Sequence, residues 1–184
     1  MILPIVAYGD AILKRRSLDI EPGHPDLSTL IQNMYDTMYE ANGVGLAAPQ
    51  VGKNIRLFIT DGSAIESLKD AGFKKIFINP IIINEEGEPW IYEEGCLSIP
   101  GIRENVSRKP NVRIQYLDEN FKPFDETYNG IQARIIQHEY DHLEGKLFVE
   151  YLPALKKQIL KGKLSNISKG KVEVDYRMRF PFKK

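Results

Sequence analysis

Cysteine and histidine are scarce in this chain, and long hydrophobic runs are missing. The 184 residues include one cysteine and three histidines. A single cysteine excludes an internal disulfide and favours a reducing compartment, so we expect a cytoplasmic protein. No apolar stretch approaches the roughly 20 residues of a membrane-spanning helix, and Met1–Val6 lacks the basic flank and the length of a signal peptide. We therefore expect no membrane partner.

Net charge is also absent, although the charges are unevenly distributed. The chain carries 25 basic and 25 acidic side chains, of which ten basic and two acidic lie in residues 156–184. That segment has a charge of +8 and the remainder a charge of −8. Such asymmetry occurs in proteins that contact nucleic acid, and more commonly in proteins with a solvated basic tail. With 42% hydrophobic and 27% charged residues, we expect one domain over residues 1–184, with a basic extension from about residue 156.

Two of the three histidines lie in one short motif, His138-Glu139-Tyr140-Asp141-His142. Histidines four residues apart lie on one face of a helix, where they can bind one metal ion together. Glu139 is then placed to move protons for a water molecule that the metal activates. The alternative is a pair of core histidines bonded to backbone carbonyls. The motif favours a hydrolytic metal site without naming a substrate.

The neighbouring sequence predicts that this motif lies on a helix. Ile131 and Ile135 extend the stripe of the two histidines at helical spacing. Asn129 followed by Gln132 predicts an N-terminal capping box, and Gly145 predicts the end of the helix. The isoleucines would bury the helix and direct the histidines into a partly buried site.

A catalytic tetrahedral site needs a third protein ligand, with the fourth position left for water. No histidine or cysteine follows His142, and Glu144 is too close along the helix to reach the metal; the other downstream glutamates are Glu150 and Glu173. Cys96, in the segment Glu94-Gly95-Cys96-Leu97-Ser98, is the better candidate. A thiolate with two imidazoles is an established metal environment. A lone cysteine is more often a small buried apolar residue. Because the predicted metal site still lacks one protein ligand, we favour Cys96 as that ligand.

A third segment, Gly43-Val44-Gly45-Leu46-Ala47-Ala48-Pro49-Gln50, follows an amphipathic helix predicted over Asp26–Asn42. Its two glycines leave the backbone bare enough to pair with an extended peptide. The alternative is a helix stop and a tight turn before a strand. That alternative explains Gly43 but not the run of small residues that ends in Gln50.

The three segments, in this order, resemble the signature motifs of peptide deformylase. The resemblance extends from Val6 to about residue 160. It implies a metal-dependent hydrolase that removes the formyl group from N-formyl-methionyl nascent peptides and releases formate. It also implies ferrous iron in the cell, with zinc or nickel often bound after purification. Beyond Leu164 the pattern departs, because Lys171–Arg177 alternates like a strand where the Gram-negative members usually end in a helix.

The resemblance agrees with the metal ligands inferred above, which are Cys96, His138 and His142. We expect Glu139 to take a proton from water and to deliver it to the leaving nitrogen. We place two hydrogen-bond donors at the developing oxyanion, the Gln50 side-chain amide and the Leu97 backbone N–H.

Further residues are candidates for substrate binding. The backbone of Val44 and Gly45 would pair with the peptide like an added strand. Ile135, with Ile131, would line a pocket for the methionine side chain. Arg103 follows the cysteine motif closely enough to meet the substrate backbone, and a solvated surface arginine is the equal alternative.

The order of elements predicts an α+β fold. Strands are expected near residues 55–60, 76–83, 112–117 and 123–128, with a hairpin turn at Asp118–Asn120. A further helix is expected near Pro153–Lys163. Antiparallel strands with inserted helices favour a single domain packed around the central metal-binding helix.

Two other function classes fit parts of the pattern. A broader H-E-x-x-H endopeptidase would need a different third ligand and would cleave internal peptide bonds. A non-catalytic metal-stabilised module would need a fourth protein ligand, and the sequence offers no candidate for it. For the deformylase hypothesis, the basic C-terminal segment is suited to the phosphate-rich surface of the ribosome. The equal alternative is that Val172, Val174 and Tyr176 pair with a sheet edge and hold the fold together, with the charges solvated. We expect no specific DNA binding.

Overall fold

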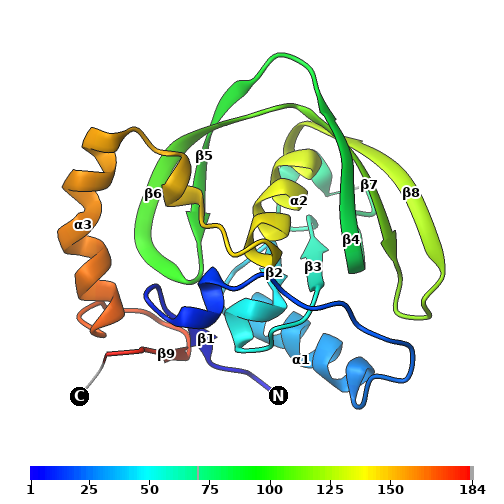
Figure 1. Cartoon of the computed structure of the whole chain (residues 1–184), viewed down its shortest axis with the longest axis horizontal. Coiled ribbons are helices and arrows are strands. Elements are labelled where there is room, and N and C mark those ends of the chain that lie inside the picture. The colour runs from blue at the N-terminus through cyan, green and yellow to red at the C-terminus, as the bar shows by residue number, and fades with distance from the viewer. Residues whose placement is uncertain (70, 183–184) are drawn as a thin grey trace.

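A single helix, α2 (Gly130–Leu143), lies at the centre of the computed structural model, and strands surround it (Figure 1). The structure describes residues 1–69 and 71–182. A five-stranded antiparallel sheet, in the order β2-β3-β4-β7-β8, lies on one side of α2. A two-stranded hairpin lies on the other side, formed by β5 (Trp90–Cys96) and β6 (Ile99–Arg108). The predicted α+β fold with antiparallel strands around the metal-binding helix is confirmed.

The five-stranded sheet contains the four strands predicted from the sequence. Its members are β2 (Gly45–Ala47), β3 (Leu57–Asp61), β4 (Lys74–Glu86), β7 (Asn111–Leu117) and β8 (Pro123–Asn129). Along β7, the alternate residues Val112, Ile114 and Tyr116 are buried against α2. The predicted turn between β7 and β8 is confirmed, and the Asp118 carboxylate stabilises it by accepting from the Asn120 N–H at 2.9 Å.

The helix expected over Asp26–Asn42 is present as α1 (Leu27–Glu40). Its apolar face, which includes Ile31, Met34 and Met38, packs in one cluster with β2 and β3. The helix is therefore placed directly before the glycine segment, and the Gly43 N–H still donates to the Met38 carbonyl at 2.8 Å.

The capping box predicted at the start of α2 is wrong, although the helix itself is confirmed. Asn129 is the last residue of β8 and is extended and exposed, and its side chain makes no capping bond. Gly130, with φ of +54°, instead turns the chain from strand to helix. Glycine adopts this conformation at no steric cost, so the strand can lead directly into the helix. The predicted end is confirmed, with Gly145 at φ of +70°.

The C-terminal third differs from the sequence prediction. The helix α3 (Ala154–Ser168) is longer than expected, and Leu160, Leu164 and Ile167 pack on a cluster that includes β6 and the N-terminal segment. The strand predicted at Lys171–Arg177 is wrong, because the strand at this end of the chain is β9 (Met178–Arg179), which begins after that range and lies parallel to β1 (Ile5–Val6).

The alternation that suggested a strand is nevertheless visible in the structure. Residues 172, 174 and 176 are half-buried, and the residues between them are exposed. A segment that lies on a protein surface can alternate in this way with or without a partner strand. The alternation alone therefore could not show that residues 171–177 form no strand. Lys183 and Lys184, which belong to the basic segment, lie outside the described residues. In the described part of the chain, no helix combines the length and apolar character that crossing a membrane requires.

Candidate metal centre

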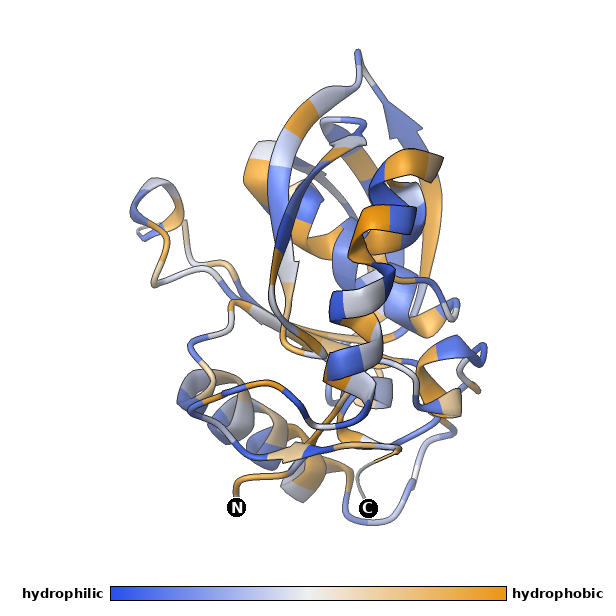
Figure 2. Cartoon of the chain, turned by 90° about the vertical axis from the view of Figure 1, so that its left-hand side faces the viewer, coloured by the Kyte–Doolittle hydropathy of each residue, from blue (hydrophilic) through white to orange (hydrophobic). Residues whose placement is uncertain are grey.

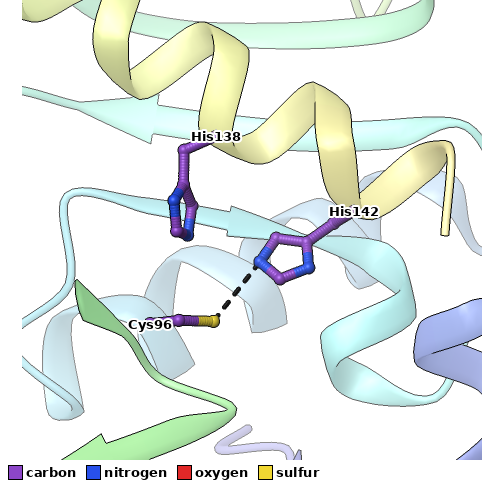
Figure 3. A group of neighbouring side chains, drawn as sticks. All are labelled: Cys96, His138 and His142. Carbon is purple, nitrogen blue, oxygen red and sulfur yellow. Dashed lines mark hydrogen bonds between the residues drawn. The ribbon is translucent and has the colours of Figure 1, made fainter. Parts of the chain in front are cut away.

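The three side chains predicted as metal ligands lie together. Cys96 comes from the end of β5, and His138 and His142 come from successive turns of α2 (Figure 3). One potential ligand atom from each residue lies within 4.8 Å of the other two. The Cys96 Sγ is 3.4 Å from the His142 Nε2. The two histidines lie together because they are four residues apart on one helix. Cys96 lies beside them because the fold places the end of β5 next to α2.

The donor set suits a divalent metal in its chemistry and its surroundings. His142 is 1% exposed, and the side chain of His138 is 11% exposed. A thiolate and two neutral imidazoles bind zinc, iron and nickel, and three protein ligands leave a position for water. The cluster therefore fits a catalytic metal better than a closed structural site.

A buried carboxylate orients His138, as is common for metal-binding histidines. The Glu94 Oε2 is 2.9 Å from the His138 Nδ1, which leaves the Nε2 free for a metal. Arg108 donates to both Glu94 oxygens at 2.7 and 3.1 Å, and Arg134 donates to one of them at 2.9 Å. Burial alone would raise the pKa of Glu94, but the hydrogen bonds from His138 and Arg108 lower it. Glu94 therefore stays ionised and holds the imidazole in one orientation.

Asp141, inside the histidine motif, completes this network. Its Oδ2 accepts from the Arg108 Nη1 at 2.7 Å, and its Oδ1 accepts from the Tyr151 hydroxyl at 3.0 Å. Sequence reasoning did not assign Glu94, Arg108 or Asp141 to the site. Two signals were present, since Glu94 lies two residues before the cysteine and Asp141 lies within the motif itself.

Glu139 is buried beside the three ligands. It is 5% exposed, and its Oε2 has no hydrogen-bond partner among the residues that the structure describes. Burial raises the pKa of Glu139 to about 7. A carboxyl group of this kind can accept and return a proton near neutral pH.

Gly45 allows this carboxylate to approach the backbone of β2. A Cβ atom built at Gly45 would lie 2.8 Å from the Glu139 Cδ, closer than real Cβ contacts. A side chain at position 45 would therefore displace the carboxylate. The glycine was predicted for its bare backbone, and the structure gives this second reason.

Gln50 faces the cluster with its donor side. Its Oε1 accepts from the Ala47 N–H at 2.8 Å, which fixes the orientation of the amide. Its Nε2 is then directed to the Cys96 Sγ at 3.5 Å and to the Ser98 Oγ at 3.4 Å. Gln50 is 2% exposed, so its amide is preorganised rather than solvated.

A cleft of about 840 Å³ opens beside these residues. Its wall includes the four predicted substrate-binding residues, which are Val44, Gly45, Arg103 and Ile135, together with Ile131, Gln50, Leu97 and Glu139. Arg103 lies at the rim, because its side chain is 65% exposed and donates to the Glu93 Oε1 at 2.7 Å. The structure thus places Arg103 both on the surface and on the cleft.

This geometry agrees with the comparisons with known proteins. A family model described as polypeptide deformylase matches residues 2–158. The chain belongs to the polypeptide deformylase family. A peptide deformylase of Christiangramia forsetii is 55% identical over 190 residues, covering 98% of this chain and 97% of the relative. A peptide deformylase structure from Legionella pneumophila is 39% identical with a TM-score of 0.82, covering 93% of this chain and 98% of that one.

A second solved structure adds a bound peptide. The class I type b peptide deformylase from Acinetobacter baumannii, bound to Met-Ala-Ser, is 36% identical with a TM-score of 0.77. The match covers 83% of this chain and 99% of that one. Peptide deformylases are metal-dependent hydrolases that remove the N-formyl group from nascent peptides, and this chain is one of them.

The downstream glutamates, which are the alternative candidates for the third ligand, lie outside the cluster of Cys96, His138 and His142. Glu144 forms an ion pair with Arg56 at 2.7 Å, and Glu150 forms one with Lys14 at 2.6 Å. Glu173 is exposed and lines the cleft. Three further tail residues, which the sequence did not place there, also line it: Val174, Asp175 and Tyr176. The hydrophobic alternation of the tail carries no indication of the cleft.

Proposed function

We propose that this chain removes the formyl group from N-formyl-methionyl nascent peptides with Cys96, His138 and His142 as metal ligands and Glu139 as the proton carrier. One observation carries the proposal: three ligand atoms converge beside a buried carboxylate with a raised pKa, and Cys96, His138 and Glu139 line one cleft. The whole of residues 1–184 would form a single catalytic domain, since the tail pairs with β1 and lines that cleft.

Ferrous iron is the metal we propose for the cell, with zinc or nickel able to replace it during purification. The donor set accommodates all three metals, and zinc has the higher raw affinity. When bound, such a metal polarises a carbonyl and lowers the pKa of water from near 16 to about 7. A free thiolate ligand persists in a reducing compartment, which supports a cytoplasmic location.

The chain's own residues would carry the proton transfers and stabilise the charge. Glu139 would take a proton from the attacking water and then deliver it to the leaving nitrogen, so that formate and a free amino terminus result. The Gln50 amide and the Leu97 N–H would donate to the oxyanion that develops on the formyl oxygen. Each donor contributes roughly 3 kcal/mol in comparable sites.

Substrate recognition would use both the backbone and the apolar lining of the cleft. A peptide could pair with the backbone of Val44 and of Gly45, the first residue of β2, and Ile135 with Ile131 would contact the methionine side chain. Arg103, at the rim, would meet the peptide backbone farther from the reacting bond. The bound Met-Ala-Ser of the Acinetobacter relative supports a methionine-first peptide as the ligand of this cleft.

The role of Gln50 gives a prediction about how kinetic constants separate. Gln50→Ala is expected to lower kcat by about 10²-fold while KM changes little, because the amide binds charge that develops only in the transition state. Steady-state kinetics of formate release would measure both constants. An unchanged kcat with a raised KM would make Gln50 a ground-state binding residue instead.

We also propose that the basic C-terminal segment brings the enzyme to the ribosome. Lys157, Lys161 and Lys163 are exposed on α3, which carries mixed polar and apolar bands in Figure 2. Lys156 is partly engaged, since its Nζ is 3.0 Å from Glu104. Lysines that neutralise phosphates release counterions, so the resulting affinity falls with salt.

Charge reversal would test this recruitment. Changing Lys156, Lys157, Lys161 and Lys163 to glutamate is expected to weaken co-sedimentation with ribosomes while activity on a short formyl peptide stays nearly intact. A matched control reverses four exposed lysines elsewhere, at positions 53, 69, 109 and 122. If the wild-type protein does not sediment with ribosomes even at low salt, the recruitment role is wrong.

The proposed function is tested by the choice of substrate. Formate release from a formyl-Met peptide should be rapid, whereas the matching acetyl-Met peptide should release little acetate and no internal peptide bond should be cut. Mass spectrometry of the products separates these reactions. Internal cleavage without formate would favour the endopeptidase alternative.

A further inference from the structure

The C-terminal tail forms part of the wall of the catalytic cleft. Four consecutive residues, Glu173, Val174, Asp175 and Tyr176, line it. They lie beyond residue 158, where the match to the deformylase family model ends. Any role they have is therefore a property of this chain and of relatives that share its tail.

The tail is fixed in position on both sides of these four residues. Before them, Gly170 ends α3 with φ of +70°, and the Lys171 N–H donates to the Asn166 carbonyl at 2.9 Å. Val172 packs against the cluster that contains Val6 and Phe148. The segment thus leaves α3 in a defined direction.

Pairing with the N-terminal strand fixes the other side. The Ile5 N–H donates to the Arg177 carbonyl at 2.8 Å, and the Ala7 N–H donates to the Arg179 carbonyl at 2.9 Å. Met178 packs on the same apolar cluster as Val172. Because both ends are held, the intervening residues keep one position beside the cleft.

Tyr176 connects this stretch to the ligand-bearing loop. Its hydroxyl donates to the Leu97 carbonyl at 2.8 Å, although the two residues are 79 positions apart in the chain. Burial raises the pKa of Tyr176, so the phenol stays protonated and remains a donor over the whole working pH range.

The loop that receives this bond contains both a proposed metal ligand and a proposed oxyanion donor. Leu97 follows Cys96 directly, and its N–H is the group that we place at the reacting oxygen. The Tyr8 N–H donates to the Ser98 carbonyl at 2.8 Å, and the Gln50 Nε2 is 3.4 Å from the Ser98 Oγ. Tyr176 holds the Leu97 carbonyl, which lies in the chain between Cys96 and Ser98. Donors to an oxyanion contribute most when they are fixed before the reaction begins.

We propose that Tyr176 is a positioning residue for deformylation: its hydroxyl holds the Leu97 carbonyl, and thereby keeps the Leu97 N–H directed at the reacting formyl oxygen. This inference rests on the proposed function. It assigns to the tail a part in transition-state stabilisation, in addition to its packing against β1.

Removal of the hydroxyl alone tests the proposal. Tyr176→Phe is expected to lower kcat for formate release about tenfold with KM unchanged within twofold, a smaller loss than the 10²–10³-fold cost of deleting an oxyanion donor outright. The matched control is Tyr35→Phe, because Tyr35 also donates to a backbone carbonyl, that of Lys75 at 3.0 Å, from α1 and outside the cleft. The control should keep wild-type kcat, and both variants should keep wild-type metal content.

NMR spectra of the backbone amides of the zinc-loaded protein give a second readout. Tyr176→Phe should shift the resonance of the Ser98 amide, which shares a peptide unit with the Leu97 carbonyl, and that of the Leu97 amide. Tyr35→Phe should shift neither. A wild-type kcat in Tyr176→Phe, an equal loss in Tyr35→Phe, or a rise in KM in place of the fall in kcat would overturn the positioning role. Failure of the wild-type protein to release formate would instead refute the proposed function, and the spectra would still report whether Tyr176 holds Leu97.

Discussion

Glu139→Ala is expected to reduce formate release by about 10²–10⁴-fold while leaving the bound metal in place. The variant keeps Cys96, His138 and His142, so metal affinity should survive, but it lacks the group that moves the proton. Metal analysis of the same samples that are assayed for formate would show both results. A variant that retains the metal and more than about a tenth of the activity would contradict the role of Glu139.

Glu139→Gln offers a control with the same shape and a distinct dependence on pH. Burial raises the pKa of Glu139 from 4.5 to about 7, so in the metal-free protein the wild-type carboxyl favours the folded state most at low pH. That contribution is lost as the pH rises through 7, by up to about 3 kcal/mol. The metal-free glutamine variant should therefore melt higher than the metal-free wild type at pH 8, and the difference should shrink at pH 5. It should remain as inactive as Glu139→Ala.

Cys96→Ala is expected to lower metal occupancy sharply and to abolish activity with it. Only two imidazoles would remain, and two ligands do not hold a catalytic metal. Elemental analysis after gel filtration would measure the loss. Ser63→Ala and Ser67→Ala, at exposed positions outside the cleft, are the matched controls and should keep full occupancy.

Oxidation should reproduce the effect of the Cys96 substitution. Peroxide is expected to inactivate the iron-loaded enzyme in step with loss of the single thiol, because both the thiolate and ferrous iron are open to oxidation. Full metal content in Cys96→Ala would mean that the third ligand lies elsewhere in the chain.

Much of the candidate metal site could be predicted from the sequence because its signals are local. The spacing of His138 and His142 fixes their common face on a helix, and the isoleucines at residues 131 and 135 show which face is buried. Cys96 is indicated differently, by the number of ligands that a catalytic metal needs. This inference is possible because Cys96 is the only cysteine in the chain.

The supporting groups could not be predicted because their partners are chosen by tertiary structure. Glu94 bonds to His138 across 44 positions in the chain, and to Arg108 across the β5–β6 hairpin. Tyr176 reaches Leu97 in the same way. A carboxylate, a guanidinium or a phenol in the sequence carries no indication of which distant group it will contact. The failed capping box shows the converse, because a local pattern was overridden by the strand that leads into α2.

Metal reconstitution tests the central claim most directly, that one metal on Cys96, His138 and His142 carries the deformylation. The chelated protein should release no formate from a formyl-Met peptide. Ferrous iron added without oxygen should restore the activity linearly, up to one equivalent per chain, and should restore none in Cys96→Ala. Formate release by the fully metal-free protein, or equal restoration in the Cys96 variant, would contradict the account.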